Sequence, residues 1–328
     1  MSENPGTDPE ILSLFGVDKV EVFQSPAPVS EWPILAWCRA MGDGNPVYRD
    51  RDAARSHGHQ DVFAPPVMMY SFTMPGLPAE TQHGLLATLR RGLSKYGFDS
   101  VLAVNYEQEF ITPVRLGDRL SRTARLESMS GEKRTSVGAG YFVVMADEIV
   151  NQNGELVGRQ KLRTLFFRAD PIAEKRESAE TRKAPQPGRA STAGVELPPL
   201  AIPVTTTMII AAALATNDFE KVHHDRDLAR SQGLSDIVMN VLTSCGLAIR
   251  YVTDWGGPAT VIRRISTQLK APTYPGDTLT LSGWIEKSFE PGSATEPGSA
   301  TRVHVRGTNS SGTHIDSIIT ITGEYADV

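Results

Sequence analysis

The sequence predicts an α+β fold made of two copies of one unit, in each of which an antiparallel sheet wraps a central helix. Residues 48–61 share eight of fourteen positions with residues 223–236, which lie 175 positions later. A second pair, PVRLGD at 113–118 and PTYPGD at 272–277, matches at an offset of 159. Landmarks that recur in the same order indicate an internal duplication.

Each copy is predicted to place one buried helix ahead of four long strands. The segments 62–74 (VFAPPVMMYSFTM) and 237–252 (IVMNVLTSCGLAIRYV) are apolar on nearly every side, as a buried helix is. Alternating, β-branched runs follow, and these are typical of strands. They read VLAVNYEQEFI, RLSRTARLES, SVGAGYFVVMADEIV and LVGRQKLRTLFFR in the first half, and VIRRISTQLKA, TLTLSGWIE, TRVHVRGTN and SIITITGEY in the second.

A change in composition marks the boundary between the two units. Residues 169–200 are rich in Pro, Ala and charge and almost lack large apolar side chains, which is typical of an exposed linker. We therefore expect an N-terminal domain over 1–170, a linker over 171–198 and a C-terminal domain over 199–328. The repeat EPGSATEPGSAT at 290–301 lies between two strand-like runs and is interpreted as a long mobile hairpin tip.

Composition and charge exclude several classes of protein. The 328 residues are 40% hydrophobic and 22% charged, enough to bury a core in each half. The net charge of −5, without a Lys/Arg-rich run, argues against nucleic acid as a partner. Two cysteines are too few for a disulfide framework. The N-terminus does not read as a secretory signal and no long apolar run predicts a membrane span, so a cytoplasmic protein is expected.

One titratable residue distinguishes the two copies. His223 of the second copy is matched by Tyr48 in the first, whereas an aspartate lies five residues earlier in both, as Asp218 and Asp43. The ordinary pKa of tyrosine, about 10, makes it a poor proton acceptor at neutral pH, while histidine titrates near neutrality. A carboxylate and an imidazole together can hold and activate a water molecule. We therefore expect the chemistry in the second copy.

These residues resemble a known family. GDGNPVYRD with APPVMM in the first half, and NDFEKVHHDRD with PGDTL in the second, resemble the two halves of a MaoC-like double hot-dog enoyl-CoA hydratase. The second half is especially similar to the small subunit of a hydratase of steroid side-chain degradation. The first half is similar to the MaoC-like part of its larger partner, so the chain resembles a fusion of the two subunits.

The resemblance implies a hydro-lyase and assigns its parts. Asp218 and His223 match the catalytic pair of the family. The backbone N–H of Asn240, at the start of the buried helix, matches the donor that polarises the thioester carbonyl. Here Met239 and Asn240 stand where the family commonly has His and Gly. Pro65 occupies the matching place in the first copy and has no N–H to give. The first half is therefore expected to have kept the fold and to supply a wall for binding substrate.

The resemblance also implies the substrate and the partners. Met68, Met69 and Met74, with the extra segment 76–97, are expected to repack around a bulky acyl group, although they can equally fill a core. With a steroid side-chain enoyl-CoA the product would be a 17-hydroxy steroid acyl-CoA. Coenzyme A is part of this substrate and no separate cofactor is expected. A homodimer, or association with an aldolase or another acyl-CoA pathway enzyme, is the expected assembly, with neither a membrane nor a nucleic acid as partner.

Three alternatives remain open at this stage. The same pair run in reverse would serve a fatty-acyl dehydratase or an (R)-specific hydratase of linear chains. A non-catalytic hot-dog partner subunit is a third possibility, which an intact Asp218 and His223 argue against. A metal site at residues 218–225 is disfavoured, because adjacent histidines do not easily reach one ion. His224 is instead expected to face solvent and Asp225 to cap a helix.

Basic residues are candidates for binding the phosphates of coenzyme A, although exposed basic side chains usually only interact with solvent. The candidates form two groups, Arg90, Arg91 and Lys95 in the first half and Arg263 and Arg264 in the second.

Overall fold

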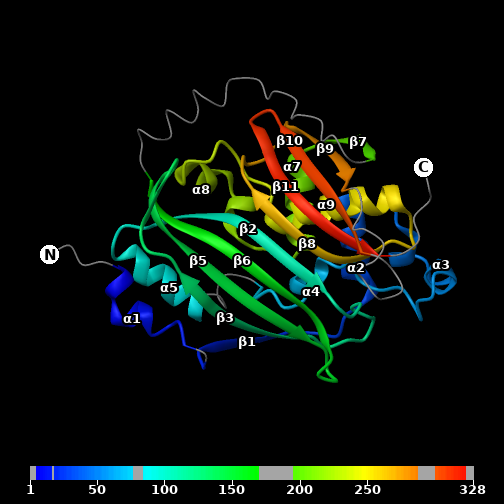
Figure 1. Cartoon of the computed structure of the whole chain (residues 1–328), viewed down its shortest axis with the longest axis horizontal. Coiled ribbons are helices and arrows are strands. Elements are labelled where there is room, and N and C mark those ends of the chain that lie inside the picture. Colours follow the sequence, from blue (N-terminus) through cyan, green and yellow to red (C-terminus); the bar gives the residue numbers. More distant parts are fainter. Residues whose placement is uncertain (1–4, 17, 77–83, 170–194, 287–299, 323–328) are drawn as a thin grey trace.

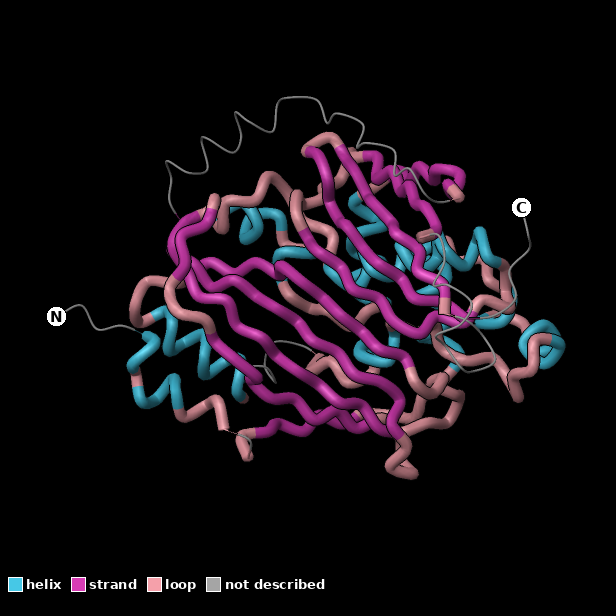
Figure 2. The backbone as a smooth tube through the Cα atoms, viewed as in Figure 1, coloured by secondary structure: helices cyan, strands magenta, loops and turns pink. Residues whose placement is uncertain are grey.

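The computed structural model describes residues 5–16, 18–76, 84–169, 195–286 and 300–322. These residues form an eleven-stranded antiparallel sheet with strand order β1-β3-β5-β6-β2-β8-β11-β10-β9-β7, and β4 pairs with β5 outside this path. In Figure 1 the helices α5, α2 and α9 lie behind the curved sheet, and Figure 2 shows the strands running side by side across the two halves. The α+β, double hot-dog prediction is confirmed, with the two predicted sheets joined edge to edge.

The first half contributes six strands to this sheet. Its strands are β1 (Val20–Gln24), β2 (Ser100–Phe110), β3 (Ser121–Met129), β4 (Lys133–Thr135), β5 (Gly138–Val150) and β6 (Leu156–Ala169). Its helices are η1 (Pro5–Thr7), α1 (Pro9–Leu12), α2 (Glu31–Met41), η2 (Pro46–Tyr48), α3 (Arg51–Ser56), α4 (Met68–Ser71) and α5 (Leu85–Ser94).

The second half repeats this order with fewer additions. Its strands are β7 (Glu196–Pro203), β8 (Val261–Leu269), β9 (Thr278–Ile285), β10 (Thr301–Asn309) and β11 (Gly312–Thr322). Its helices are α7 (Thr206–Ala215), η3 (Lys221–His223), α8 (Arg226–Ser231) and α9 (Val241–Gly256). The predicted linker, 171–198, lies outside the described residues except for 195–198, of which 196–198 belong to β7. The predicted hairpin tip lies almost wholly outside the described residues, between β9 and β10.

The internal duplication reappears in the hydrogen bonds. The Ala64 N–H bonds to the Val114 carbonyl at 2.9 Å, and the Met239 N–H bonds to the Thr273 carbonyl at 3.0 Å. These two bonds match at the offsets of 175 and 159 that separate the sequence landmarks. Helices α2 and α7 start at an offset of 175 as well, so the duplication includes elements that the sequence landmarks alone did not mark.

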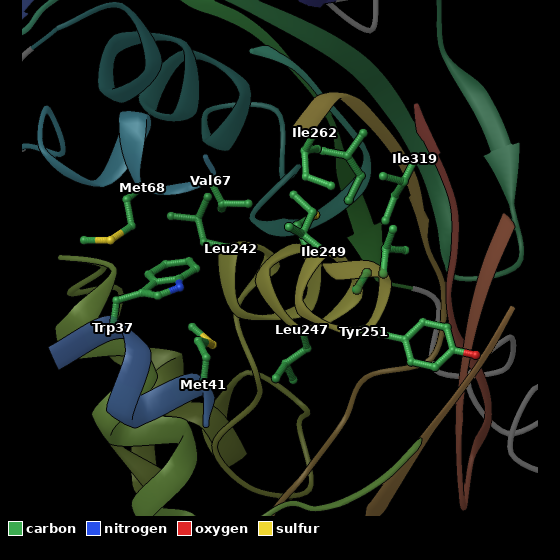
Figure 3. Packing of buried hydrophobic residues seen from close by; sticks show 14 of the residues in the cluster. Trp37, Met41, Val67, Met68, Leu242, Leu247, Ile249, Tyr251, Ile262 and Ile319 are labelled. Atoms are coloured by element: carbon green, nitrogen blue, oxygen red, sulfur yellow. The ribbon is translucent and has the colours of Figure 1, made fainter. Parts of the chain in front are cut away.

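The two halves meet through the sheet and through their helices. Strand β2 pairs with β8, with Asn105 opposite Gln268, which makes one sheet out of two. Behind it, α2 packs against α7 and α9. The Trp37 ring of α2 sits against Gly246 of α9, where a Cβ would come within 2.6 Å of the ring, so only glycine allows this close approach. Figure 3 shows Trp37, Met68 and Leu242 gathered at this junction.

The central helices of the two halves differ. Helix α9 has sixteen residues and most of them are buried. Its first-half counterpart, α4, is one turn of four residues, so the buried helix predicted over 62–74 is mostly absent. Pro65 and Pro66 precede this turn, and Pro75 with Gly76 follow it, and both residue types interrupt helices. Helix α5, in the extra segment, covers another part of the first-half sheet.

The described apolar core has two parts. The larger cluster surrounds α9 and includes residues from both halves, among them Trp37, Met68 and Met69. The smaller cluster lies beneath α1 and α5 in the first half and includes Leu89, Leu93 and Phe166. Within the described residues, none of the helices is both long enough and apolar enough to span a bilayer.

Candidate active site

Asp218 follows the end of α7, and a backbone hydrogen bond fixes its position there. Asn217 ends the helix in the left-handed conformation with φ of 55°, and the Asp218 N–H bonds back to the Ala213 carbonyl at 2.9 Å. The Glu220 N–H donates to Asp218 Oδ1 at 3.2 Å. The side chain is only 8% exposed, so it is buried at a fixed point between the helix and η3.

His223 is oriented by a backbone carbonyl. Its Nδ1 lies 2.6 Å from the Val238 oxygen, and because a carbonyl only accepts, Nδ1 carries the proton. In the neutral ring Nε2 is then an acceptor, and it lies 3.5 Å from Asp218 Oδ2. Two acceptors at this distance can each take one proton of a shared water molecule, leaving a lone pair of the water free to attack.

Asn240 fixes the carboxylate from the other side. Its Oδ1 accepts from the Thr243 N–H at 2.8 Å and caps α9, so its Nδ2 must face the opposite way. That Nδ2 donates to Asp218 Oδ2 at 3.0 Å and to Thr216 Oγ1 at 2.8 Å. This role of the Asn240 side chain was not predicted from the sequence, although asparagine is a residue that commonly caps a helix.

The backbone N–H of Asn240 lies at the start of α9, as predicted. Among the described residues no acceptor is recorded for it, nor for the N–H groups of Val241 and Leu242. Free N–H groups in a first helical turn carry partial positive charge and attract a developing oxyanion. The structure therefore brings Asp218, His223 and this N–H group to the same helix terminus.

The first-half counterpart is closed by apolar packing. Tyr48 is 4% exposed, and its ring meets the edge of Phe63 with centroids 5.2 Å apart. Burial raises the pKa of Tyr48 far above its ordinary value. Asp43 is buried as well, with Oδ1 accepting from the Asn45 N–H at 2.9 Å. The loop conformation has been kept here, but a buried tyrosine replaces the histidine.

A small cavity of about 70 Å³ lies beside Tyr48. It is lined by Phe63 and Met69 of the first half and by Ile262 and Arg263 of the second. A wider hollow of about 390 Å³, lined by Glu31, Leu35 and Arg55, also borders Tyr48. The Tyr48 ring therefore lies between two pockets, although its own side chain is buried.

The other residues predicted from the sequence differ in how deeply they are buried. Met68 and Met69 are each 1% exposed within the larger core cluster, while Met74 is half-buried and offers its carbonyl to Asn217 Nδ2 at 3.2 Å. Contact between these methionines and a substrate stays a prediction. His224 is exposed and Asp225 caps α8 by accepting from the Leu228 N–H at 3.0 Å.

The candidate coenzyme A ligands each already have a partner in the protein. Arg90 pairs with Glu220 at 3.6 Å across the two halves, and Lys95 pairs with Glu10 at 2.7 Å. Arg91 donates to Thr88, Arg263 to Thr322 and Arg264 to Glu107. Their contact with phosphates stays a prediction. Across the described ranges no group of three or more metal-ligating side chains comes together.

Asn217 provides a test of how the loop that carries Asp218 is held in place. Its first-half counterpart is Gly42, with φ of 61°, so both copies need the left-handed conformation at this position. We expect Asn217→Ala to cost about 1–2 kcal/mol of unfolding free energy, because alanine is strained there. Asn217→Gly relieves the strain and loses only the side-chain bond, so it should be the more stable variant. Urea unfolding measures both, and equal losses would contradict this account.

Asp43 provides a test by pH. Burial, with the Asp254 charge adding to it, raises the pKa of Asp43 above its ordinary value of 3.8. A folded-state pKa above the unfolded one means that stability is lost as pH rises through the folded value. Asp43→Asn should therefore reduce the loss of unfolding free energy between about pH 4 and pH 7. Urea unfolding at both pH values measures it, and an unchanged slope would refute the assignment.

Comparison with known proteins places these observations in a family. Residues 20–160 match the "FAS1-like, dehydratase domain region" and residues 191–306 match the "MaoC like domain". A solved MaoC-like dehydratase superposes with a TM-score of 0.71 at 18% identity, over 96% of this chain and 100% of that one. A Mycobacterium tuberculosis protein described as a double hot-dog fold superposes with a TM-score of 0.62 at 16% identity, over 96% and 98% of the two chains.

Curated relatives match parts of the chain at higher identity. The β subunit of 3-oxo-4,17-pregnadiene-20-carboxyl-CoA hydratase from M. tuberculosis is 43% identical over 39% of this chain and 94% of the relative. The α subunit of that enzyme is 36% identical over 43% of this chain and 45% of the relative. A Thermomonospora curvata protein named as a probable enoyl-CoA hydratase α subunit is 40% identical over 43% of this chain and 46% of the relative.

This chain therefore spans nearly all of the β subunit but about half of either α subunit. Similarity to both kinds of subunit, with two successive domain matches, is consistent with the fusion that the sequence suggested. The chain belongs to the MaoC-like double hot-dog hydratase family.

Proposed function

We propose that this chain hydrates an α,β-unsaturated acyl-CoA at the site formed by Asp218, His223 and the start of α9, and that its substrate is a steroid side-chain enoyl-CoA. The single observation that carries the reaction is the pair of acceptors, His223 Nε2 and Asp218 Oδ2, 3.5 Å apart at a helix terminus with free N–H groups. The acceptor pair can bind and deprotonate water, and the N–H groups can bind the thioester oxygen. The site therefore has a group for water activation and a group for stabilising the developing negative charge.

The proposed reaction proceeds in two proton transfers. Water held by Asp218 and His223 attacks the β-carbon while one of its protons passes to this pair. Electron density moves from the double bond to the thioester oxygen, where the Asn240 N–H stabilises the negative charge. A proton then returns from the pair to the α-carbon. The sum is the addition of one water molecule, without a redox step.

Positioning by neighbours supports this reaction. Val238 fixes which nitrogen of His223 is protonated, and Asn240 fixes which oxygen of Asp218 faces the ring. A catalytic pair held in this way needs little reorganisation when substrate binds. In the first half Tyr48 and Pro65 remove both the proton acceptor and the N–H group, so we infer one active site per chain.

Two observations support a bulky acyl group. The central helix of the first half is shortened to the four residues of α4, so it covers less of the sheet than the sixteen residues of α9 do in the second half. Two matched relatives carry a steroid carboxyl-CoA hydratase name. We propose that the acyl skeleton extends from the second-half site towards the first half, and that hydration across the bond between side chain and ring D gives a 17-hydroxy product.

Substrate preference tests this proposal. Loss of enoyl-thioester absorbance is followed with a steroid side-chain enoyl-CoA and with short and medium linear enoyl-CoAs. We expect the steroid thioester to have the higher kcat/KM, since it alone fills the proposed volume. A higher kcat/KM for a linear thioester would overturn the steroid assignment and favour fatty-acyl hydration. Inactivity with every thioester would support a non-catalytic partner subunit.

A further inference from the structure

Three polar side chains form a row across the concave face of the first-half sheet. Asp147 of β5 lies opposite Gln160 of β6, and Gln160 lies opposite Gln108 of β2. All three are 1–3% exposed. We call Asp147, Gln160 and Gln108 the polar row. Long polar side chains on the face that a hot-dog helix normally covers are unusual, because burying them requires a partner for every polar atom.

The second half shows what the duplication places at the same positions. There Thr267 of β8 lies opposite Ser317 of β11, and Ser317 lies opposite Val305 of β10. These side chains are small, and the Cys245 thiol of α9 lies 3.5 Å from Thr267 Oγ1. The second-half row is short because a full helix packs on it. The polar row replaces this arrangement in the half where the helix is reduced to α4.

One end of the polar row is fully bonded. Asp147 accepts from Arg122 Nη1 at 2.8 Å and from Gln160 Nε2 at 2.8 Å. Because Gln160 Nε2 faces a carboxylate, its Oε1 faces the other way and accepts from the Tyr106 hydroxyl at 2.6 Å. The same Oε1 also accepts a hydrogen bond from Gln108 Nε2 at 3.4 Å. The orientation of every amide in the row therefore follows from Asp147.

The other end of the row is unpaired. With Nε2 of Gln108 turned towards Gln160, its Oε1 is left over, and this buried oxygen has no hydrogen-bond partner among the described residues. The Ser71 hydroxyl of α4 is likewise buried without a partner. An amide oxygen only accepts, so the missing partner of Gln108 is a hydrogen-bond donor.

A chain of contacts through Tyr70, Thr73 and Met74 links the polar row to the candidate active site. The Tyr70 ring of α4 packs 4.7 Å from the Arg122 guanidinium. Burial raises the pKa of Tyr70, while the Arg122 charge lowers it and the Asp147 and Asp218 carboxylates raise it. The Thr73 carbonyl binds Arg122, and the next residue, Met74, binds Asn217 beside Asp218.

We propose that the polar row is the polar end of the acyl-binding site, where Gln108 Oε1 accepts a hydrogen bond from a hydroxyl group on the acyl skeleton remote from the thioester. This inference rests on the proposed function, because it takes the acyl group to extend into the first half. It goes further by naming a specificity-determining residue and the chemical group that it selects.

Binding to an inactive background tests the inference without turnover. Dissociation constants are measured with the Asp218→Asn protein for a steroid enoyl-CoA that carries a ring-A hydroxyl and for its deoxy counterpart. We expect the hydroxyl form to bind about fivefold more tightly, the scale of one neutral hydrogen bond. Gln108→Leu in the same background should abolish this difference, chiefly by weakening the hydroxyl form.

Thr267→Val serves as the matched control, since it alters the equivalent position of the second-half row and should leave the preference intact. Equal binding of both thioesters to the Asp218→Asn protein would overturn the inference even if Gln108→Leu failed to fold. An equal weakening of both by Gln108→Leu would also overturn it, because that is the effect of a purely structural residue. Hydration of the steroid thioesters by the unmodified chain is measured separately, so failure of the proposed function is distinguishable from failure of this inference.

Discussion

Replacing Asp218 by Asn is expected to lower kcat by about 100-fold or more, and replacing His223 by Ala by a similar factor. Each change removes one of the two acceptors that hold and deprotonate water. Asn can still accept from the Glu220 N–H through its carbonyl oxygen, but its NH2 group then faces Asn240 Nδ2 and that hydrogen bond is lost, so a moderate loss of stability is expected. Initial rates of enoyl-thioester hydration, with circular dichroism as the check on folding, measure the effect.

The duplication supplies matched controls for these variants. Asp43→Asn and Tyr48→Phe make comparable changes at the corresponding positions of the first half, where both side chains are buried. We expect kcat to stay within about twofold of the unmodified chain, because neither residue exchanges a proton. If Tyr48→Phe abolished turnover while substrate still bound, the active site would have been assigned to the wrong half.

Breaking the buried ion pair between Arg122 and Asp147 should have the largest effect on stability. The two side chains are 2% and 1% exposed and 2.8 Å apart. Asp147→Ala leaves a buried guanidinium without its counter-charge, which typically costs about 3–5 kcal/mol. Urea unfolding of the variant measures the loss. Replacing both residues by apolar ones of similar volume should cost less than Asp147→Ala alone.

The neighbouring residue gives the control for this prediction. Glu148 follows Asp147 on β5 but points to solvent, where it pairs with Arg159 at the same distance of 2.8 Å. The side chains of Glu148 and Arg159 are both about half exposed. Glu148→Ala should therefore cost at most about 1 kcal/mol of unfolding free energy. Equal losses of unfolding free energy for Asp147→Ala and Glu148→Ala would show that burial does not set the strength of these ion pairs.

Much of the fold follows from the sequence because the duplication repeats local constraints. The loop that carries Asp218 recurs around Asp43, and the aspartates of PVRLGD and PTYPGD bond their own turns in the same way, Arg115 N–H to Asp118 and Tyr274 N–H to Asp277. Side-chain caps and turns of this kind depend on residues close in sequence. They can therefore be predicted from one chain without an alignment.

The remainder depends on packing across the two halves. The shortening of α4 is an exception, because the flanking prolines and Gly76 limit the helix and the apolar pattern of 62–74 does not take them into account. The side-chain role of Asn240 depends on Thr216 and Asp218, more than twenty residues away. The polar row unites residues of three strands through their register. Alternation along one strand predicts a buried position but not which buried side chains meet.

The identity of the product tests the central claim most directly. The chain is incubated with a steroid side-chain enoyl-CoA in water labelled with heavy oxygen, and the acyl-CoA is analysed by mass spectrometry. The account predicts a product heavier by one labelled water, with the label at the β-carbon, formed by the unmodified chain and the Asp43→Asn variant but hardly at all by Asp218→Asn. Unchanged substrate with the unmodified chain, or equal labelling by Asp218→Asn, would contradict it.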